Sequence, residues 1–310
     1  MWGKFSFVAL LAASALALSA CAAPQTSELT LSPGVLPMEA EVRNVPFFPQ
    51  EDNFCGPAAL ATVVAWTGIS VNPEQIAERV YTPGRQGTLQ SDILGAARRE
   101  GRLAVPVVSL RDVMTEIAAG HPVFVLQNLS LGWYPQWHYA VAFAYNLEKN
   151  EITLRSGREP ERIMPMNTFE RTWQRGDHWA LVVLNPDGLP ASADVSQVEH
   201  AAAALERVDR TKEAAVAYST ILKRWPKSYP ALMGLGNLHY ADGDLETAEI
   251  AFRLAILEHP ERAEAWNNLA YVLAAKGQKR EAVAAAQRAI KLSPGNEQPY
   301  LETLQDLSET

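Results

Sequence analysis

Proline returns at a fixed interval in the last third of the chain, and this repeat constrains the fold more than any other feature. The prolines are 34 residues apart, at Pro226, Pro260 and Pro294. Small residues keep the same interval, at Ala214, Ala248 and Ala282. Each proline ends a helical stretch, because proline has no N–H to donate and its ring blocks a further turn. A repeat of this length predicts pairs of helices that stack on one another.

This pattern resembles the tetratricopeptide repeat, and we expect three units over residues 197–310, the first of them degenerate. The middle unit matches best, with Leu232, Leu235, Gly236, Ala248, Phe252, Ala255 and Pro260. Gly236 is small enough for paired helices to approach closely, whereas Phe252 and Trp266 fill the space between neighbouring helices. The resemblance implies a face that binds a peptide or another protein. The alternative is an array that only caps or orients the first domain.

The chain opens with MWGKFSFVALLAASALALSA, in which Lys4 is the only charged residue. A basic start, an apolar core and small residues at the end are typical of a signal peptide over residues 1–20. The run Leu-Ser-Ala before Cys21 resembles the bacterial lipobox. The resemblance implies that Cys21 carries lipid on the periplasmic side of a bacterial membrane, and Ala22, in place of an aspartate, favours the outer membrane. An incidental cysteine behind an ordinary signal peptide is the alternative.

Breaks in composition divide the rest of the chain. Residues 21–40 are rich in Pro, Ser, Thr and Ala, and we expect a lipidated tether there. The stretch NPDGLPASADVS, residues 185–196, predicts a linker between a first domain over residues 41–184 and the repeats. The formal net charge is −8, from 27 basic and 35 acidic residues, which argues against nucleic acid as a partner. We expect no metal and no cofactor.

The first domain carries helix signals first and strand signals later. The expected helices cover residues 56–67, a segment that begins at residue 72, residues 88–100 and residues 109–119. The expected strands cover residues 122–127, 138–145, 151–155 and 178–184. Helices followed by a run of antiparallel strands predict an α+β domain.

Cys55 lies in the stretch PQEDNFCGPAAL, at the start of an apolar helix. If Cys21 carries lipid, Cys55 has no disulfide partner. Unpaired N–H groups and the helix dipole favour negative charge at this position, so we expect a lowered pKa for the thiol. The amide of Gln50, five residues earlier, is placed to stabilise an oxyanion together with the backbone N–H of Cys55. A buried, inert cysteine is the alternative.

A thiolate nucleophile also needs a base. His138 begins the strand segment HYAVAFAY, and a rigid strand end is a suitable mount for an imidazole. His121 and His178 are interpreted as structural, and the other three histidines lie in the repeats. The loop LSLGWYPQW, residues 129–137, either lines a substrate cleft or forms a small local core.

Together, PQEDNFCGPAAL and HYAVAFAY resemble the C39-like peptidases, which are papain-fold cysteine peptidases. The resemblance covers about residues 43–184. It implies that Cys55 is the nucleophile, His138 the general base and acid, and Gln50 a donor to the oxyanion. No transporter segment accompanies the domain, so leader processing during export is not expected.

One residue departs from the family pattern. The family usually has an aspartate that orients the histidine at the end of the next strand, and here Ser156 stands in its place. A serine can accept a hydrogen bond from the ring but cannot stabilise an imidazolium by charge. Asp177 or Glu159, from other segments, are the alternatives.

These patterns predict an α+β papain-like cysteine peptidase domain followed by an all-α tetratricopeptide-repeat array. The expected function is that of a lipid-anchored periplasmic peptidase, whose repeats recruit a protein partner. Two other functions stay open. One is a papain-like fold with a weak or inactive site that acts as a binding or scaffold lipoprotein. The other is an enzyme that transfers the acyl group to an amine or cleaves a cell-wall peptide.

Overall fold

The computed structural model describes residues 23–49, 54–85 and 87–309. The chain divides into two compact units. Of the described residues, the first unit contains those from 23 to 100, 104–184 and 190–193, and the second contains 101–103, 185–189 and 194–309. The expected signal peptide, Cys21 and Gln50 lie outside the described residues.

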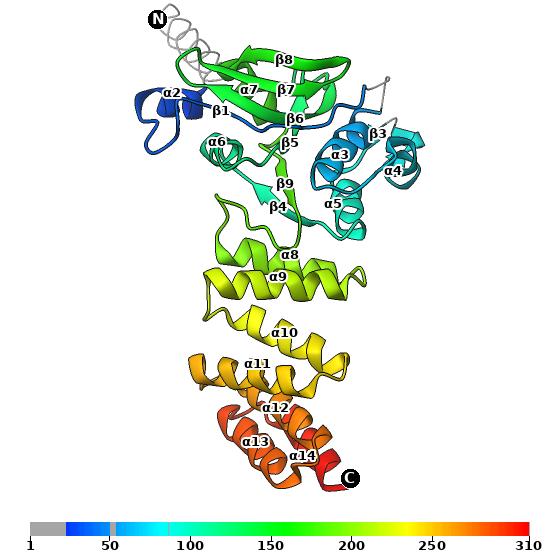
Figure 1. The fold of residues 1–310 in the computed structure, drawn as a ribbon, viewed down its shortest axis with the longest axis vertical. Coiled ribbons are helices and arrows are strands. Elements are labelled where there is room, and N and C mark those ends of the chain that lie inside the picture. Colours follow the sequence, from blue (N-terminus) through cyan, green and yellow to red (C-terminus); the bar gives the residue numbers. More distant parts are fainter. Residues whose placement is uncertain (1–22, 50–53, 86, 310) are drawn as a thin grey trace, which may run out of the picture. The chain divides into compact units, whose positions relative to one another are not determined.

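A seven-stranded sheet forms the centre of the first unit (Figure 1). Its strands follow the order β4–β9–β5–β6–β7–β8, and β1 pairs with the last residues of β6. From β9 to β8, each pair of neighbours is antiparallel. The strands are β1 (Glu39–Glu41), β4 (Leu103–Val107), β5 (Val123–Asn128), β6 (Trp137–Asn146), β7 (Glu151–Ser156), β8 (Glu159–Pro165) and β9 (Ala180–Leu184). A separate two-stranded ribbon pairs β2 (Tyr81–Thr82) with β3 (Gly87–Thr88), around a short 3₁₀ turn at Pro83–Arg85.

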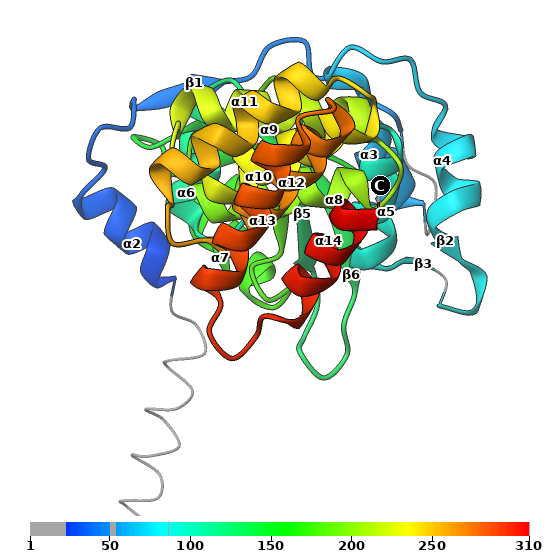
Figure 2. The same cartoon turned by 90° about the horizontal axis from the view of Figure 1, so that it is seen from below.

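Helices cover the sheet and group at its two ends. They are α3 (Cys55–Trp66), α4 (Pro73–Val80), α5 (Gln90–Arg99), α6 (Leu110–Ala118) and α7 (Met166–Gln174). Figures 1 and 2 show α3, α4 and α5 together at one end, with α2 (Pro24–Leu31) at the other. The helix α3 packs on β6, α7 packs on β5, and α6 contacts β1, β5 and β6. Residues 56–64 of α3 are all buried, because this helix is apolar on every side.

The four helices expected from the sequence are present, and so are the four expected strands. The strands β1, β2, β3, β4 and β8 and the helix α7 were not predicted from the sequence. The strand β8 is hidden in the sequence because Pro160, Glu161 and Arg162 break any alternation of apolar and polar residues. As the last strand in the sheet order, β8 tolerates proline because one of its sides needs no hydrogen-bonded partner strand.

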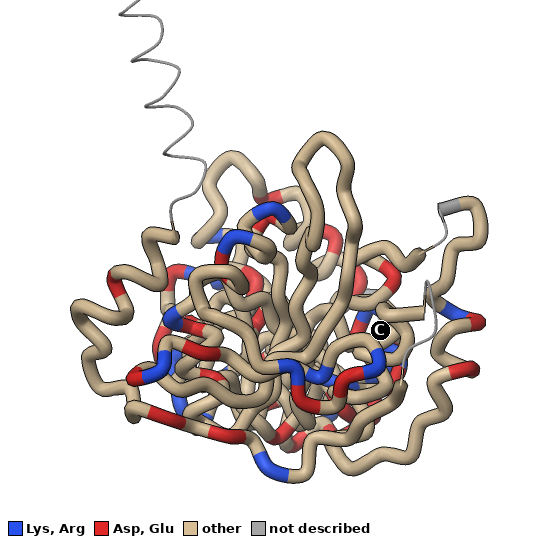
Figure 3. The backbone as a smooth tube through the Cα atoms, turned by 90° about the horizontal axis from the view of Figure 1, so that it is seen from above, with Lys and Arg blue, Asp and Glu red and all other residues tan. Residues whose placement is uncertain are grey.

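The hairpin that joins β5 to β6 projects from the first unit (Figure 2). Its connecting loop covers residues 129–136. Figure 3 shows no Lys, Arg, Asp or Glu along this hairpin.

The expected tether contains a docked helix instead of an irregular chain. The helix α2 contacts α6 and α7 and buries Leu29. The buried carboxylate of Glu170 accepts hydrogen bonds from the backbone N–H groups of Gln25, at 2.9 Å, and Thr26, at 2.7 Å. A carboxylate is favourable here, because the first N–H groups of a helix have no partner within the helix.

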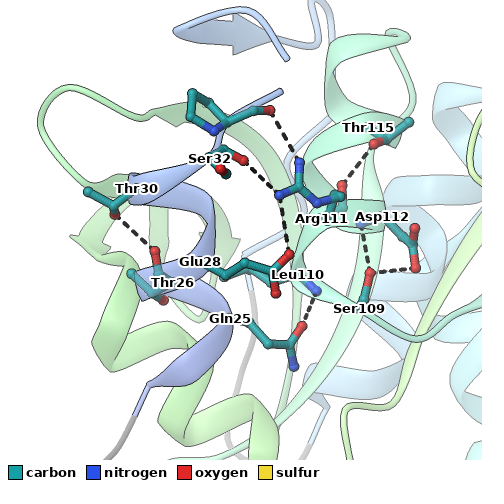
Figure 4. A network of polar contacts seen from close by, with 11 residues as sticks. Gln25, Thr26, Glu28, Thr30, Ser32, Ser109, Leu110, Arg111, Asp112 and Thr115 are labelled. Carbon is teal, nitrogen blue, oxygen red and sulfur yellow. Dashed lines mark hydrogen bonds and ion pairs between the residues drawn. The ribbon is translucent and has the colours of Figure 1, made fainter. Parts of the chain in front are cut away.

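Side chains hold both ends of α2 against α6 (Figure 4). At the start of α2, the Gln25 side chain accepts a hydrogen bond from the backbone N–H of Leu110 at 2.6 Å. Beyond its end, Arg111 donates to the carbonyl oxygens of Ser32, at 2.8 Å, and Pro33, at 3.2 Å. The segment therefore folds through contacts with distant residues, which its Pro-, Ser- and Thr-rich composition did not reveal.

Seven helices form the second unit, among the residues that the structure describes. They are α8 (Val195–Glu206), α9 (Thr211–Arg224), α10 (Tyr229–Ala241), α11 (Leu245–Glu258), α12 (Ala263–Ala275), α13 (Lys279–Leu292) and α14 (Gln298–Glu309). The starts of α8, α10 and α12 are 34 residues apart, and so are those of α9, α11 and α13. Helix α14 packs on α12 and α13 after the third pair.

Small residues set the spacing between helices of the repeats, as the sequence predicted. A Cβ added at Gly236 of α10 would lie 2.6 Å from Cε1 of Phe252 of α11. That distance is far below a normal contact, so the two helices can come this close only with glycine at residue 236.

We predict that Gly236→Ala lowers the free energy of unfolding of the repeats by about 1–3 kcal/mol. The added methyl group displaces the Phe252 ring, and this cost exceeds the gain of about 1 kcal/mol from the higher helix propensity of alanine. Thermal unfolding followed by circular dichroism measures the change.

The matched control is the double variant Gly236→Ala with Phe252→Leu, compared with each single variant. The smaller leucine makes room for the methyl group, so the two effects should be clearly non-additive. A stabilised Gly236→Ala protein would contradict the close packing.

Candidate active site

Cys55 is the first residue of α3, and its thiol lies among backbone N–H groups. Phe54 occupies the N-cap position of this helix. The sulfur faces the N–H groups of Cys55 itself, of Gly56 and of Tyr139 in β6. Cys55 is a free, partly buried cysteine. Since His138 directly precedes Tyr139, the nucleophile and base predicted from the sequence belong to the same corner of the first unit.

Gly56 allows α3 to approach β6 and β3 this closely. A Cβ at residue 56 would lie 2.8 Å from Cβ of Thr88 and 3.3 Å from Cδ2 of Tyr139. The Tyr139 hydroxyl donates a hydrogen bond to the carbonyl oxygen of Thr88 at 3.1 Å. Its buried ring stacks on Phe124 at a centroid distance of 5.2 Å. These contacts fix the backbone of β6 beside the sulfur.

His138 is held by one polar contact to its far nitrogen. Nε2 of His138 lies 2.8 Å from Oγ of Ser156, a buried residue at the end of β7. Of the two acidic alternatives, Glu159 pairs with Arg162 at 3.8 Å. Asp177 lies in the turn between α7 and β9, with its N–H bonded to Gln174. The structure therefore brings Ser156, rather than a carboxylate, to the ring.

The surroundings of His138 keep its ring neutral at pH 7. Burial, as the larger cause, and the positive charge of Arg162 together lower the pKa of His138 to about 4. The partner, Ser156, is uncharged and offers no compensation for an imidazolium.

The expectation of a lowered thiol pKa is wrong for the structure as it stands. Burial raises the pKa of the Cys55 thiol above its usual range. The N–H groups of Tyr139, Gly56 and Cys55 lower this pKa, but burial is the larger effect. The resting site therefore holds a protonated thiol and a neutral imidazole instead of an ion pair.

Four of the other five histidines have partners of their own. Nδ1 of His121 lies 2.7 Å from Oε2 of Glu116, and Nε2 of His178 lies 3.2 Å from Nε2 of Gln25. In the repeats, His239 pairs with Asp244 and His259 contacts the carbonyl oxygen of Lys227. Gln50, the predicted oxyanion donor, lies outside the described residues, so its role stays a prediction.

The parts of the site that depend on the backbone were not predicted from the sequence. The N–H of Tyr139 contacts the sulfur, and Thr88 anchors the Tyr139 hydroxyl. Phe54, the residue before Cys55, stacks on Tyr81 at a centroid distance of 5.0 Å. The pair His-Tyr in the sequence signals the tyrosine, whereas nothing in the sequence links Thr88 or Tyr81 to Cys55.

The loop of residues 129–137 does not form a local core. Leu131, Trp133, Tyr134 and Trp137 are all exposed. No group of His, Cys, Asp or Glu suited to a metal ion occurs in the described part of the chain. Within residues 23–49, 54–85 and 87–309, every helix is too short or too polar to cross a membrane.

Comparison with known families agrees with this architecture. Residues 42–179 match the family model described as Peptidase_C39 like family. Two models described as Tetratricopeptide repeat match residues 207–270 and 263–296. The predicted families and fold class are thereby confirmed. None of the curated proteins matches the chain.

Two solved structures illustrate the similarity of the separate parts. One is a proposed C39-like peptidase from Bacillus anthracis, with 18% identity and a TM-score of 0.41 over 48% of this chain and 98% of that chain. The other is the Sgt2 TPR domain from Aspergillus fumigatus, with 19% identity and a TM-score of 0.35 over 37% of this chain and 77% of that chain.

We predict that alkylation of Cys55 by iodoacetamide is slow at pH 7 and rises about tenfold per pH unit up to pH 9, because only the thiolate reacts. The rate constant is measured by mass spectrometry of the peptide that contains Cys55. Cys55→Ala is the control for labelling elsewhere. A rate that is already on a plateau between pH 5 and pH 8 would show a thiolate–imidazolium pair instead.

We further predict that Ser156→Asp increases alkylation at pH 7 and that Ser156→Asn does not. A carboxylate beside Nε2 raises the pKa of His138, and the resulting imidazolium lowers the pKa of the thiol. The amide has nearly the same size without the charge. Equal rates in the two variants, with both folded by circular dichroism, would contradict the assigned role of charge at residue 156.

Proposed function

We propose, from the premise that the chain carries a C39-like peptidase domain followed by tetratricopeptide repeats, that it is a cysteine peptidase anchored by lipid on Cys21. Its place is the periplasmic side of a bacterial membrane, with the outer membrane favoured. The observation that carries the proposal is the geometry around β6. Ser156 holds His138 by the far nitrogen, and the Cys55 sulfur lies beside the next residue, Tyr139.

In the first step, Nδ1 of His138 takes the proton of the Cys55 thiol while the sulfur attacks the carbonyl carbon of a peptide bond. This requires the ring to donate Nε2–H to Ser156, which leaves Nδ1 as the acceptor. The oxyanion that forms receives hydrogen bonds from the backbone N–H of Cys55 and from the amide of Gln50. His138 then gives its proton to the leaving amine, and the C–N bond breaks.

In the second step, water replaces the sulfur. His138 takes a proton from water, the oxygen attacks the thioester carbon, and the C–S bond breaks. The sulfur recovers its proton from His138, and a carboxylic acid leaves. Each group in this scheme returns to its starting state, so no cofactor is needed.

The repeats recruit a protein partner in this proposal. A stack of helix pairs presents a surface much larger than that of one helix, and such surfaces bind peptides and proteins. The repeats contribute no group to the chemistry, and the substrate is a peptide or a protein.

A second function is favoured by the neutral pair in the site. A protonated thiol, a neutral ring and a serine at residue 156 also suit a papain-like fold with weak or no activity that acts as a scaffold lipoprotein. Acyl transfer to an amine needs the same first step and differs only in the group that accepts the acyl chain.

We predict that the protein generates new N-termini in a mixture of casein peptides and that Cys55→Ala abolishes them. His138→Ala should lower the rate by at least about 100-fold, because general base catalysis is lost. Mass spectrometry of the peptides measures the products over time.

Hydroxylamine in a parallel reaction separates the three functions. A hydroxamate on the cleaved peptides traps the acyl-enzyme and supports the first step. Amide products formed with added amines, in preference to acids, would favour the transferase. Equal peptide patterns for the wild-type protein and Cys55→Ala would overturn the peptidase and leave the scaffold.

A further inference from the structure

The tip of the β5–β6 hairpin presents large apolar side chains to solvent. The exposed fractions are 56% for Leu131, 80% for Trp133, 71% for Tyr134 and 52% for Trp137. Isolated exposed apolar residues are common on protein surfaces, but here four of them lie within seven residues of one projecting loop.

Internal hydrogen bonds give this hairpin a defined shape. The side-chain oxygen of the buried Asn128 accepts from the N–H groups of Ser130, at 3.1 Å, and Gln136, at 2.9 Å. Nearer the tip, Leu131 and Tyr134 form a β-bridge. The aromatic side chains therefore project from a preformed support. Binding of any partner to these side chains would avoid the entropy cost of ordering a flexible loop.

Charge is absent from the hairpin and present at the opposite end of the same strand. No Asp, Glu, Lys or Arg occurs between Glu116 and Glu148. The turn between β6 and β7 carries Glu148 and Lys149, both exposed. Trp and Tyr concentrate at the interface between lipid and water, where an apolar ring with a polar atom is favourable.

The start of the folded chain lies on the same side of the first unit as the hairpin tip. In Figure 3, the end of α2 at which the described chain begins and the hairpin tip both point upward. Only two residues separate Cys21 from Pro24, the first residue of α2. These span at most about 10 Å from Cys21 to α2. A lipid on Cys21 would thus hold this side of the unit close to the bilayer.

We propose that the tip of the β5–β6 hairpin docks the first unit on a phospholipid bilayer, with Leu131, Trp133 and Tyr134 in the interfacial layer. The proposal rests on the lipid anchor of the proposed function. The tip lies about four residues along the hairpin from His138, or about 13 Å, so the site stays outside the bilayer. The substrate class that fits is a peptide segment close to the membrane surface.

The test uses the lipid-bearing chain in vesicles of phosphatidylethanolamine and phosphatidylglycerol. In a Cys55→Ser background, an environment-sensitive fluorophore is attached at Leu131→Cys or at Lys149→Cys, the matched control at the other end of β6. We expect the probe at residue 131 to emit at shorter wavelength and to be quenched by nitroxide-labelled lipid. The probe at residue 149 should keep a water-like spectrum. Trp133→Ser with Tyr134→Ser should reduce the quenching at residue 131 several-fold.

Three results would overturn the docking. These are a water-like spectrum at residue 131 in vesicles, equal quenching at residues 131 and 149, or a blue shift at residue 131 that appears only when casein peptides are added. The last result would indicate that the tip binds the peptide substrate instead of the bilayer. The mass of the same sample shows whether Cys21 carries lipid. Without lipid the proposed anchor fails. The spectra at residues 131 and 149 then test the docking of the hairpin on the bilayer by itself.

Discussion

The contact between the first turn of α3 and the start of β6 is the constraint on which the site depends. A side chain at residue 56 would overlap Thr88 and press on the Tyr139 ring. With glycine there, the sulfur of Cys55 reaches the N–H of Tyr139, so Cys55 and His138 share one corner. Tyr139 is fixed in turn by Phe124 and by the carbonyl oxygen of Thr88. The Cys-Gly pair is thus a requirement of packing as much as of chemistry.

The protonation states of Cys55 and His138 follow from the lack of a stabilising charge beside the imidazole ring. Buried groups stay uncharged unless a partner stabilises the charge. Ser156 orients the His138 ring but carries no charge, and the positive charge of Arg162 opposes protonation of the ring. In the proposed peptidase, proton transfer from the thiol therefore accompanies attack on the substrate, instead of preceding it. A thiol in this state is expected to react slowly with simple electrophiles, and the proposed peptidase depends more on a well-placed carbonyl and on oxyanion donors.

The parts of the fold that depend on local pattern could be predicted, and those that depend on distant contacts could not. The 34-residue period fixed the helix pairs, and the apolar run after Cys55 fixed α3. Ser156 was found because it occupies the position of a motif residue. In contrast, α2 depends on Glu170, which is more than a hundred residues away in the sequence. No local sequence pattern predicts this contact. The pKa of Cys55 was mispredicted for the same reason, since burial is a property of the whole fold.

The docked α2 changes how far the proposed active site could reach from an anchor at Cys21. A flexible tether of twenty residues would let the site sample a wide shell above the membrane. The segment is instead held by Glu170 and Arg111, with buried Leu29 beneath it. If Cys21 is in the bilayer, the first unit can move only by the few residues before α2. The substrates that it meets are then those presented at the membrane surface, and selection by position adds to any selection by the site itself.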